Sequence, residues 1–264
     1  MTKFVPLYSG SSGNSTAVVH DGRVLLVDIG CSCRKTVGAL YSIGQAASEV
    51  EAILLTHEHS DHIGGLSVFL RHYPVPVYGT AGTLSEVERL CALPADTELR
   101  VLSGEEELCG MGVRSFATPH DSRECCGFRF SLGRQSAAIA TDIGHMTQEV
   151  YNNLLGCQAV LLESNYDEGL LMMGRYPYPL KQRIRSDYGH LSNYDCADTL
   201  SRLVQAGAEH IRLMHLSAEN NTPERALSAV RWALADAGFD LPLAAAPRSG
   251  LSRRYGREVP VCSE

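Results

Sequence analysis

The chain has 264 residues, of which 44% are hydrophobic and 20% charged, and this globular composition excludes disorder and collagen-like repeats. No apolar run approaches the roughly 18 residues that a membrane-spanning helix needs, so we expect no membrane partner. The formal net charge of −7 means that a nucleic-acid partner must bind a local basic patch rather than the whole surface. Nine cysteines without a regular spacing favour reduced thiols, and the start of the sequence lacks the apolar stretch of a secretory signal, so we expect a cytoplasmic protein.

Hydrophobic patterning predicts strands and helices that alternate along most of the chain. Predicted strands cover residues 3–8, 15–20, 23–28, 52–56, 75–78, 98–102, 107–118, 124–132, 136–141, 159–163 and 211–214. Predicted helices cover residues 29–44, 63–72, 81–91, 147–155, 192–205 and 222–237. Asp21-Gly22 is the signal of a two-residue hairpin turn, and Thr222-Pro223 is a typical helix start. Trp232, in the last helix, is expected to lie in the core.

Two β-rich halves, each with its own helices, follow one another without a low-complexity linker. A sheet must bury one face, and two such sheets do so by packing against each other with their helices outside. The sequence therefore predicts an α/β fold class, a four-layer α/β/β/α sandwich that forms a single domain over residues 1–264.

The most informative stretch is residues 56–62, which read THEHSDH. It places His57, His59, Asp61 and His62 in an H-x-H-x-D-H pattern. Imidazole nitrogen and carboxylate oxygen are the ligands that borderline Lewis acids such as zinc accept, and four of them in a compact loop can serve two ions. In an extended segment the first two histidines point the same way, whereas the Asp and last His can face a neighbouring site.

Three more ligand-type residues come shortly after predicted strands. His120 follows the strand that ends at 118, Asp142 follows the strand that ends at 141, and His215 follows the strand that ends at 214. A rigid sheet can hold such a side chain within about 0.5 Å of the position that a metal demands. Together with the H-x-H-x-D-H stretch, these residues predict a metal centre.

This order of residues resembles the metallo-β-lactamase superfamily over essentially the whole chain. The resemblance implies a metallo-β-lactamase-type sandwich and two divalent metal ions, for which zinc, manganese and iron all remain open. Residue by residue, it implies that His57, His59 and His120 bind the first ion, that Asp61, His62 and His215 bind the second, and that Asp142 bridges both. The oxygen-reducing di-iron branch has a glutamate at the position where this chain has His59. The histidine therefore argues against that branch.

Further stretches resemble the YycJ (also WalJ) group of this superfamily, bacterial proteins regarded as exonucleases that act on DNA. These stretches are residues 9–15, 163–167 and 176–193. The acidic second stretch and the later Gly-His-Leu-Ser also resemble ribonuclease Z, whose equivalent histidine assists phosphodiester cleavage. The resemblance therefore implies a catalytic role for His190, and we expect Ser192 and Asn193 of the same motif to contact substrate. The long insertion of ribonuclease J and cleavage-factor nucleases is lacking, which disfavours those branches.

A local basic segment precedes this motif. Residues 174–186 hold four positive charges and no acid, and tyrosines lie between the charges, as in channels that bind single strands. We expect Lys181, Arg183 and Arg185 to bind phosphates of a nucleic-acid substrate, with DNA as the leading candidate. The competing interpretation is an ordinary solvated face.

The leading hypothesis is a binuclear-metal-dependent phosphodiesterase that acts as a DNA exonuclease. Two cations lower the pKa of a bridging water and supply hydroxide at neutral pH. Asp61 and Asp142 would hold the metals and orient this hydroxide, and His190 would donate to the phosphate or protonate the leaving oxygen. One alternative is a metallo-hydrolase of a small thioester, lactone or cyclic phosphodiester. Another is a nucleic-acid-binding or regulatory protein without turnover, which the complete ligand set disfavours. DNA against RNA, strand polarity and oligomeric state stay open.

Overall fold

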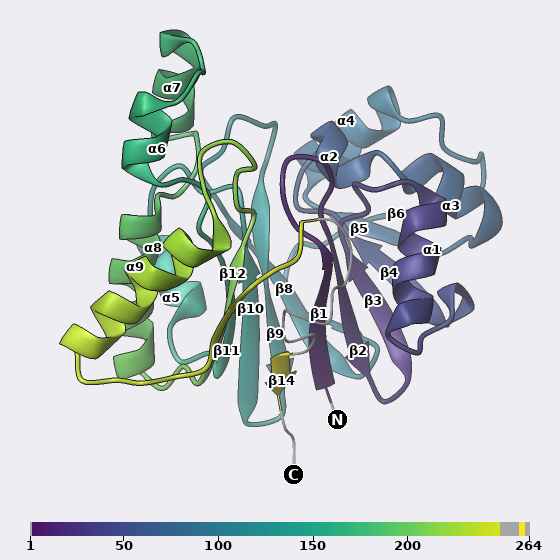
Figure 1. Cartoon of the computed structure of the whole chain (residues 1–264). Helices are drawn as coiled ribbons and strands as arrows, with labels where there is room; N and C mark the ends of the chain where they lie inside the picture. Colours follow the sequence, from purple (N-terminus) through teal and green to yellow (C-terminus); the bar gives the residue numbers. More distant parts are fainter. Residues whose placement is uncertain (1, 249–258, 262–264) are drawn as a thin grey trace.

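The computed structural model describes residues 2–248 and 259–261, and these form two mixed β-sheets packed face to face (Figure 1). In spatial order, the first sheet consists of β14 (Val259–Val261), β1 (Thr2–Tyr8), β2 (Ser15–His20), β3 (Arg23–Val27), β4 (Val50–Leu54), β5 (Val77–Gly79) and β6 (Leu99–Val101). The second sheet consists of β13 (Leu243–Ala245), β12 (His210–Met214), β11 (Ala159–Glu163), β10 (Gln135–Ala140), β9 (Cys126–Leu132), β8 (Met111–Ala117) and β7 (Glu106–Leu108).

Helices cover the outer faces of both sheets (Figure 1). On the first sheet they are α1 (Cys33–Ser42), α2 (Ser60–Ile63), α3 (Leu66–His72) and α4 (Ala81–Leu90), with the short 3-10 turn η1 (Ala47–Glu49) before β4. The second half contributes α5 (Gln148–Leu154), α6 (Glu168–Met173), α7 (Tyr178–Ile184), α8 (Asn193–Gln205) and α9 (Pro223–Asp236). The predicted four-layer α/β/β/α sandwich is confirmed. Figure 1 shows α6 and α7 projecting beyond the sheet, and we call residues 168–186 the arm.

Hydrophobic side chains fill the space between the sheets and beneath both helical layers. Between the sheets, the rings of Phe4 and Phe130 meet edge to face with centroids 5.1 Å apart, and both are fully buried. Burying such a side chain contributes about 1.5–3 kcal/mol. The hairpin turn is confirmed, since Asp21 and Gly22 have φ angles of 48° and 81°, as a type I′ turn requires. The sandwich is thus a rigid frame for residues at its strand ends.

The structure corrects three expectations. The single strand predicted over 107–118 is two strands, β7 and β8, because Cys109 and Gly110 turn the chain with φ angles of 52° and 78°. Trp232 is 76% exposed rather than buried, because α9 packs through Ala226, Val230 and Leu234, spaced four apart, and Trp232 lies off this stripe. The basic segment, in which the sequence predicts no helix, contains α7. Within the described residues, no helix combines the length and the apolarity needed to cross a membrane.

Candidate metal centre

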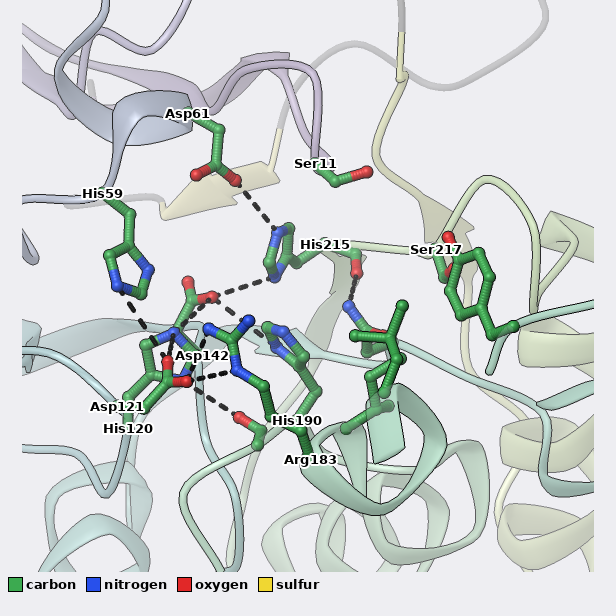
Figure 2. Close-up of a pocket in the computed structure, with 15 residues that line it drawn as sticks. Ser11, His59, Asp61, His120, Asp121, Asp142, Arg183, His190, His215 and Ser217 are labelled. Atoms are coloured by element: carbon green, nitrogen blue, oxygen red, sulfur yellow. Dashed lines mark hydrogen bonds and ion pairs between the residues drawn. The ribbon is translucent and has the colours of Figure 1, made fainter. Parts of the chain in front are cut away.

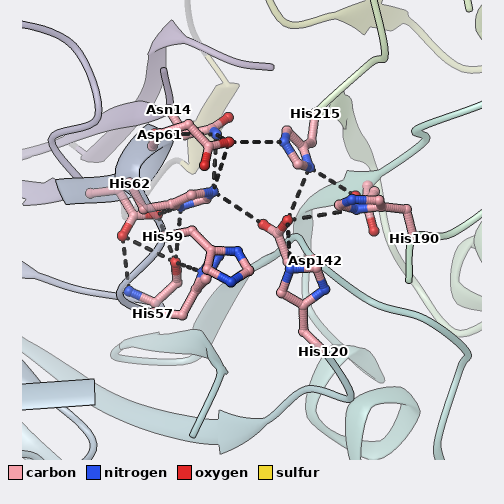
Figure 3. Close-up of polar contacts among 12 residues, drawn as sticks. Asn14, His57, His59, Asp61, His62, His120, Asp142, His190 and His215 are labelled. Carbon is pink, nitrogen blue, oxygen red and sulfur yellow. Dashed lines mark hydrogen bonds and ion pairs between the residues drawn. The ribbon is translucent and has the colours of Figure 1, made fainter. Parts of the chain in front are cut away.

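Strand ends from both sheets bring the candidate ligands together (Figure 3). The strands β10, β11 and β12 run parallel, so their carboxyl ends lie at one edge of the second sheet. Asp142 follows β10, Glu163 ends β11 and His215 follows β12. In the first sheet β3 and β4 are also parallel, and Asp28 and His57 come just after them. The site therefore lies where the two sheets present their strand ends to each other.

Backbone strain is concentrated at these strand ends. Asp28, Asp142 and His215 have φ angles of 62°, 59° and 54°. These values lie in the left-handed region, which residues other than glycine rarely adopt. This conformation is less favourable by roughly 1–2 kcal/mol per residue. Such strain persists where the surrounding structure imposes a required side-chain position, and it is typical of functional sites.

Among the described residues, the candidate ligand atoms form four overlapping groups, and two of these contain the residues that the sequence predicted for the two ions. One group is His57, His59 and His120, and the other is Asp61, His62 and His215; within each group the ligand atoms all lie within 4.8 Å of one another. Ligands at about 2.0–2.2 Å from one divalent ion stay within this span. These are the two sets that the family resemblance implied. Sequence order alone could not have shown that they lie together in space.

Asp142 lies between the two groups (Figure 3). Its Oδ1 is 3.7 Å from His120 Nε2, on the side of the first group. Its Oδ2 is 3.4 Å from His62 Nε2, and its Oδ1 is 3.3 Å from His215 Nδ1, on the side of the second. The carboxylate is therefore within reach of both groups, Oδ1 on the side of His120 and His215 and Oδ2 on the side of His62, which is the position that a bridging ligand requires.

Several buried polar atoms of this cluster have no hydrogen-bond partner: His57 Nε2, His215 Nε2 and Asp142 Oδ2. A buried polar atom without a partner is unfavourable by about 1–3 kcal/mol, so three of them in one place need an explanation. Imidazole nitrogens and carboxylate oxygens are suitable ligands for zinc, manganese or iron. The donor set and its unpartnered atoms therefore fit divalent metal ions.

Asp28 supports the second group and was not among the predicted site residues. Its Oδ2 is 2.8 Å from His62 Nδ1, and its Oδ1 accepts hydrogen bonds from the backbone N–H and the hydroxyl of Thr56. A carboxylate on one ring nitrogen fixes the imidazole and directs the other nitrogen, here Nε2, toward a metal. In this structure Asn14 Nδ2 lies 3.0 Å from that Nε2. The signal in the sequence was the one used for the other ligands, an acidic residue just after an apolar strand.

Glu163 supports two histidines at once. Its Oε1 is 2.9 Å from the Nδ1 atoms of both His190 and His215, and its Oε2 accepts the backbone N–H groups of Ile143 and Leu191. Burial favours the neutral acid, but the two imidazoles outweigh it and hold the pKa of Glu163 below its ordinary value. The sequence pointed to Glu163 only as the first residue of an acidic stretch, because its two partners are distant in the chain.

Glu163→Gln is expected to weaken metal binding by about 10–100-fold, because a neutral amide orients His215 less firmly than a carboxylate does. Competition with a fluorescent chelator measures this change. Glu168→Gln, at the start of α6, is the matched control and should bind metal as the wild type does. Unchanged affinity in Glu163→Gln would show that the carboxylate has no part in holding the centre.

The electrostatics of the cluster favour bound cations. Burial, with His62 and His120 nearby, holds the pKa of His57 well below its ordinary value, so this imidazole is neutral and free to act as a ligand. Burial also disfavours a charge on His62, but Asp28 and Asp142 outweigh this and raise the pKa of His62 to about 9. The same carboxylates that attract a proton attract a metal ion.

The cluster opens into a cavity of about 220 Å³ (Figure 2). One wall consists of candidate ligands and His190, Ser11 of the loop between β1 and β2 lies at another side, and the arm closes a third. Arg183 of the arm donates from Nε to Asp121 Oδ2 at 2.6 Å, and Asp121 Oδ1 is 3.4 Å from His120 Nε2. The arm is thereby connected to the first ligand group.

Only part of the predicted substrate-binding set faces this cavity. Arg183 lines it and its side chain is 62% exposed. Arg185 is exposed beside the sulfur of Met172 and is not among the lining residues. Lys181 is buried, and its Nζ donates to the backbone oxygens of Met172 and Gly174 at 2.7 Å each. The expectation that Lys181 binds phosphate is therefore corrected, because its ammonium group already bonds the end of α6.

Ser192 and Asn193 are also buried away from the cavity. Ser192 caps the N-terminus of α8 by accepting the N–H of Asp195, and Asn193 bonds Ser164 and Asn221. These bonds occupy the polar groups that we expected to contact substrate. Their roles are to start α8 and to position the chain after His190.

Lys181→Met is expected to lower the free energy of unfolding by about 1–3 kcal/mol, because the carbonyls of Met172 and Gly174 lose a charged donor that is itself buried. Denaturant unfolding measures the loss. Lys35→Met, at an exposed lysine on α1, is the control and should unfold like the wild type. If Lys181→Met is as stable as the wild type but binds DNA more weakly, Lys181 does bind phosphate.

Comparison with known proteins agrees with this geometry. The family model of the metallo-beta-lactamase superfamily matches residues 8–154, more than half of the chain, and the chain belongs to this superfamily. It is 37% identical over 238 residues to Exodeoxyribonuclease YycJ of Bacillus anthracis, covering 89% of this chain and 90% of that protein. It is 36% identical over 233 residues to Exodeoxyribonuclease WalJ of Streptococcus pneumoniae serotype 2, covering 85% of each. The resemblance to the YycJ/WalJ group is confirmed.

Among solved structures, that of Zn(2+)-bound PqqB from Methylobacterium extorquens is similar, with a TM-score of 0.72. It covers 94% of this chain and 98% of that one at 18% identity. An identity this low shows a common fold alone. The metallo-β-lactamase-type sandwich is thus confirmed by the fold, and the assignment of activity rests on the sequence relatives.

Proposed function

We propose that this protein is a metal-dependent exodeoxyribonuclease. The observation that carries the proposal is the likeness to YycJ and WalJ over most of both lengths, combined with the two ligand groups. In this proposal one ion is held by His57, His59 and His120, the other by Asp61, His62 and His215, and Asp142 contacts both. Divalent ions bound there supply Lewis-acid charge stabilisation and an activated water.

His190 is the proposed general acid. Glu163 bonds its Nδ1 at 2.9 Å, which leaves Nε2 as the ring nitrogen available to a substrate in the cavity. A protonated His190 can donate from Nε2 to a phosphate oxygen or to the leaving oxygen. Its ring is 5.1 Å from that of His120 and 5.2 Å from that of His215, so it lies next to both ligand groups.

Arg183 and Arg185 are the proposed phosphate-binding residues outside the ligand groups. In the double variant Arg183→Ala/Arg185→Ala, the slope of log affinity against log salt is expected to fall by about 0.7 for each single-strand phosphate that the protein no longer neutralises. Fluorescence anisotropy with a labelled oligodeoxynucleotide, at several salt concentrations and with Ca²⁺ in place of the active metal, measures the slope. Arg231→Ala, at an exposed arginine on α9, is the control. An unchanged slope in the double variant would show that neither arginine neutralises a phosphate of the bound DNA.

The proposed function is tested with purified protein, Mn²⁺ or Zn²⁺, and end-labelled single- and double-stranded DNA and RNA. Stepwise shortening of DNA from an end is the expected result. Absence of DNA cleavage with every metal, together with turnover of a thioester or lactone, would replace the proposal by the small-molecule alternative. Cleavage of RNA but not of DNA would show that RNA, rather than DNA, is the substrate.

Two further assignments belong to the same proposal. We place the protein in the cytoplasm, which is supported by free thiols at all the cysteines in the described part of the chain. We treat residues 1–264 as a single domain, because both sheets contribute ligand candidates to one centre; residues 249–258 and 262–264 of that range lie outside the described part.

A further inference from the structure

The arm presents an apolar wall to the metal-centre cavity. Leu180 and Ile184 are four residues apart on α7 and so lie on one face of the helix, and Tyr176 lies just before the helix begins. All three line the cavity and are partly exposed in it. The remaining lining is mainly histidine, carboxylate, hydroxyl and amide groups. The cavity therefore has a polar, metal-ligand side and an apolar side, which the proposed chemistry at phosphorus does not use.

The apolar wall is held at a fixed place relative to His190. The backbone N–H of His190 donates to Ile184 O at 2.9 Å, and Lys181 bonds the end of α6 from within the arm. A Cβ atom on Gly189 would lie 2.1 Å from Ile184 O, so the backbone here is in close contact and only glycine fits. The wall and the proposed general acid thus belong to one rigid unit.

The cavity at the metal centre is small. Its volume of about 220 Å³ lies below the roughly 300–1,000 Å³ of pockets that enclose drug-sized ligands. A single base, with its flat apolar faces, suits a wall of one aromatic ring and two aliphatic side chains. Arg183, next to Ile184 on the same helix, lines the same cavity, where its guanidinium bonds Asp121.

We propose that Tyr176, Leu180 and Ile184 form a nucleobase subsite, which receives the unpaired terminal base of a DNA strand and so places the adjoining phosphate at the metal centre. This inference rests on the proposed exodeoxyribonuclease function and adds its substrate class, a strand end that carries an unpaired base. A wall that binds any base by its faces does so without regard to sequence.

The test compares oligodeoxynucleotides that end in a natural nucleotide with oligodeoxynucleotides that end in an abasic tetrahydrofuran nucleotide. Each end of the strand is modified in a separate substrate, so the polarity of digestion need not be known. The wild type is expected to remove the abasic nucleotide about 10–100-fold less efficiently, as kcat/KM, at the end where digestion starts. This comparison needs no variant and cannot fail through misfolding.

Variants then identify the wall. Tyr176→Ala and Leu180→Ser are each expected to lower kcat/KM by about 10-fold or more on natural ends and by less than about 2-fold on abasic ends. Met173→Ala, at an arm residue that is 82% exposed, and Tyr194→Ala, at an exposed tyrosine on α8, are the controls and should match the wild type on both substrates.

The outcomes separate the subsite from the proposed function. If the wild type shortens DNA but removes natural and abasic nucleotides equally well, the subsite is refuted and the exonuclease function stands. Equal losses of the variants on both substrates would likewise refute it, because the side chains would then act through the fold of the arm. A wild type that does not cleave DNA refutes the proposed function itself.

Discussion

Asp142→Ala is expected to leave the protein with fewer than two equivalents of divalent metal and to reduce DNA cleavage by about 10³-fold or more. The carboxylate of Asp142 lies between the two ligand groups, with oxygens 3.4 Å from His62 Nε2 and 3.7 Å from His120 Nε2. A Lewis acid at a phosphoryl oxygen lowers the activation free energy by several kcal/mol, and each 1.36 kcal/mol of activation free energy is a factor of ten in rate. Elemental analysis after dialysis and single-turnover assays measure the two effects.

A second substitution separates loss of the ligand from loss of the fold. Asp142 has a φ angle of 59°, which asparagine tolerates better than alanine. Asp142→Asn is therefore expected to keep the backbone and still lose metal, because an amide is a weaker ligand than a carboxylate. Asp236→Asn, an exposed position at the end of α9, is the control. Two tightly held ions and normal turnover in Asp142→Asn would refute the bridging assignment.

The sequence was most informative where covalent spacing or a strand end determines position. His57 and His59 come two apart directly after β4, and Asp142 and His215 follow parallel strands of the second sheet, so local pattern was sufficient to select them. Glu163 was harder to assign. Its role depends on His190 and His215, which lie 27 and 52 residues further along the chain, and on the order of the strands. Only the folded chain shows that partnership.

The basic segment shows why a count of charges is insufficient. Lys181 and Arg183 are two residues apart on α7, which places them about 200° apart around the helix. Arg183 consequently lines the cavity, whereas Lys181 is buried against the end of α6. The sequence did not predict α7, so it could not distinguish these faces. Trp232 was misplaced although its helix was predicted, because membership of a helix does not specify which face is buried.

His190→Ala is expected to lower the rate of DNA cleavage by about 10²–10⁴-fold, the usual contribution of a single positioned acid. The loss should be much smaller for bis(p-nitrophenyl) phosphate, because an activated aryl oxygen departs without protonation. Steady-state rates on both substrates give this ratio. His145→Ala is the matched control: this exposed histidine bonds the backbone oxygen of Asp187 and should keep the wild-type rate on both.

Metal content decides between two roles for His190. Its Nδ1 is 3.6 Å from Asp142 Oδ1 and 2.9 Å from Glu163 Oε1, and a ring nitrogen also lies within 4.8 Å of a ligand atom of His215, so geometry alone also permits a ligand role. As Glu163 already bonds Nδ1 at 2.9 Å, we expect His190→Ala to keep the metal content of the wild type. If His190→Ala loses metal, His190 is a metal ligand, and the loss of metal explains the lower rate of DNA cleavage. A variant that keeps its metal and cleaves DNA at the wild-type rate would remove His190 from catalysis, and a small-molecule hydrolase would then explain the centre better.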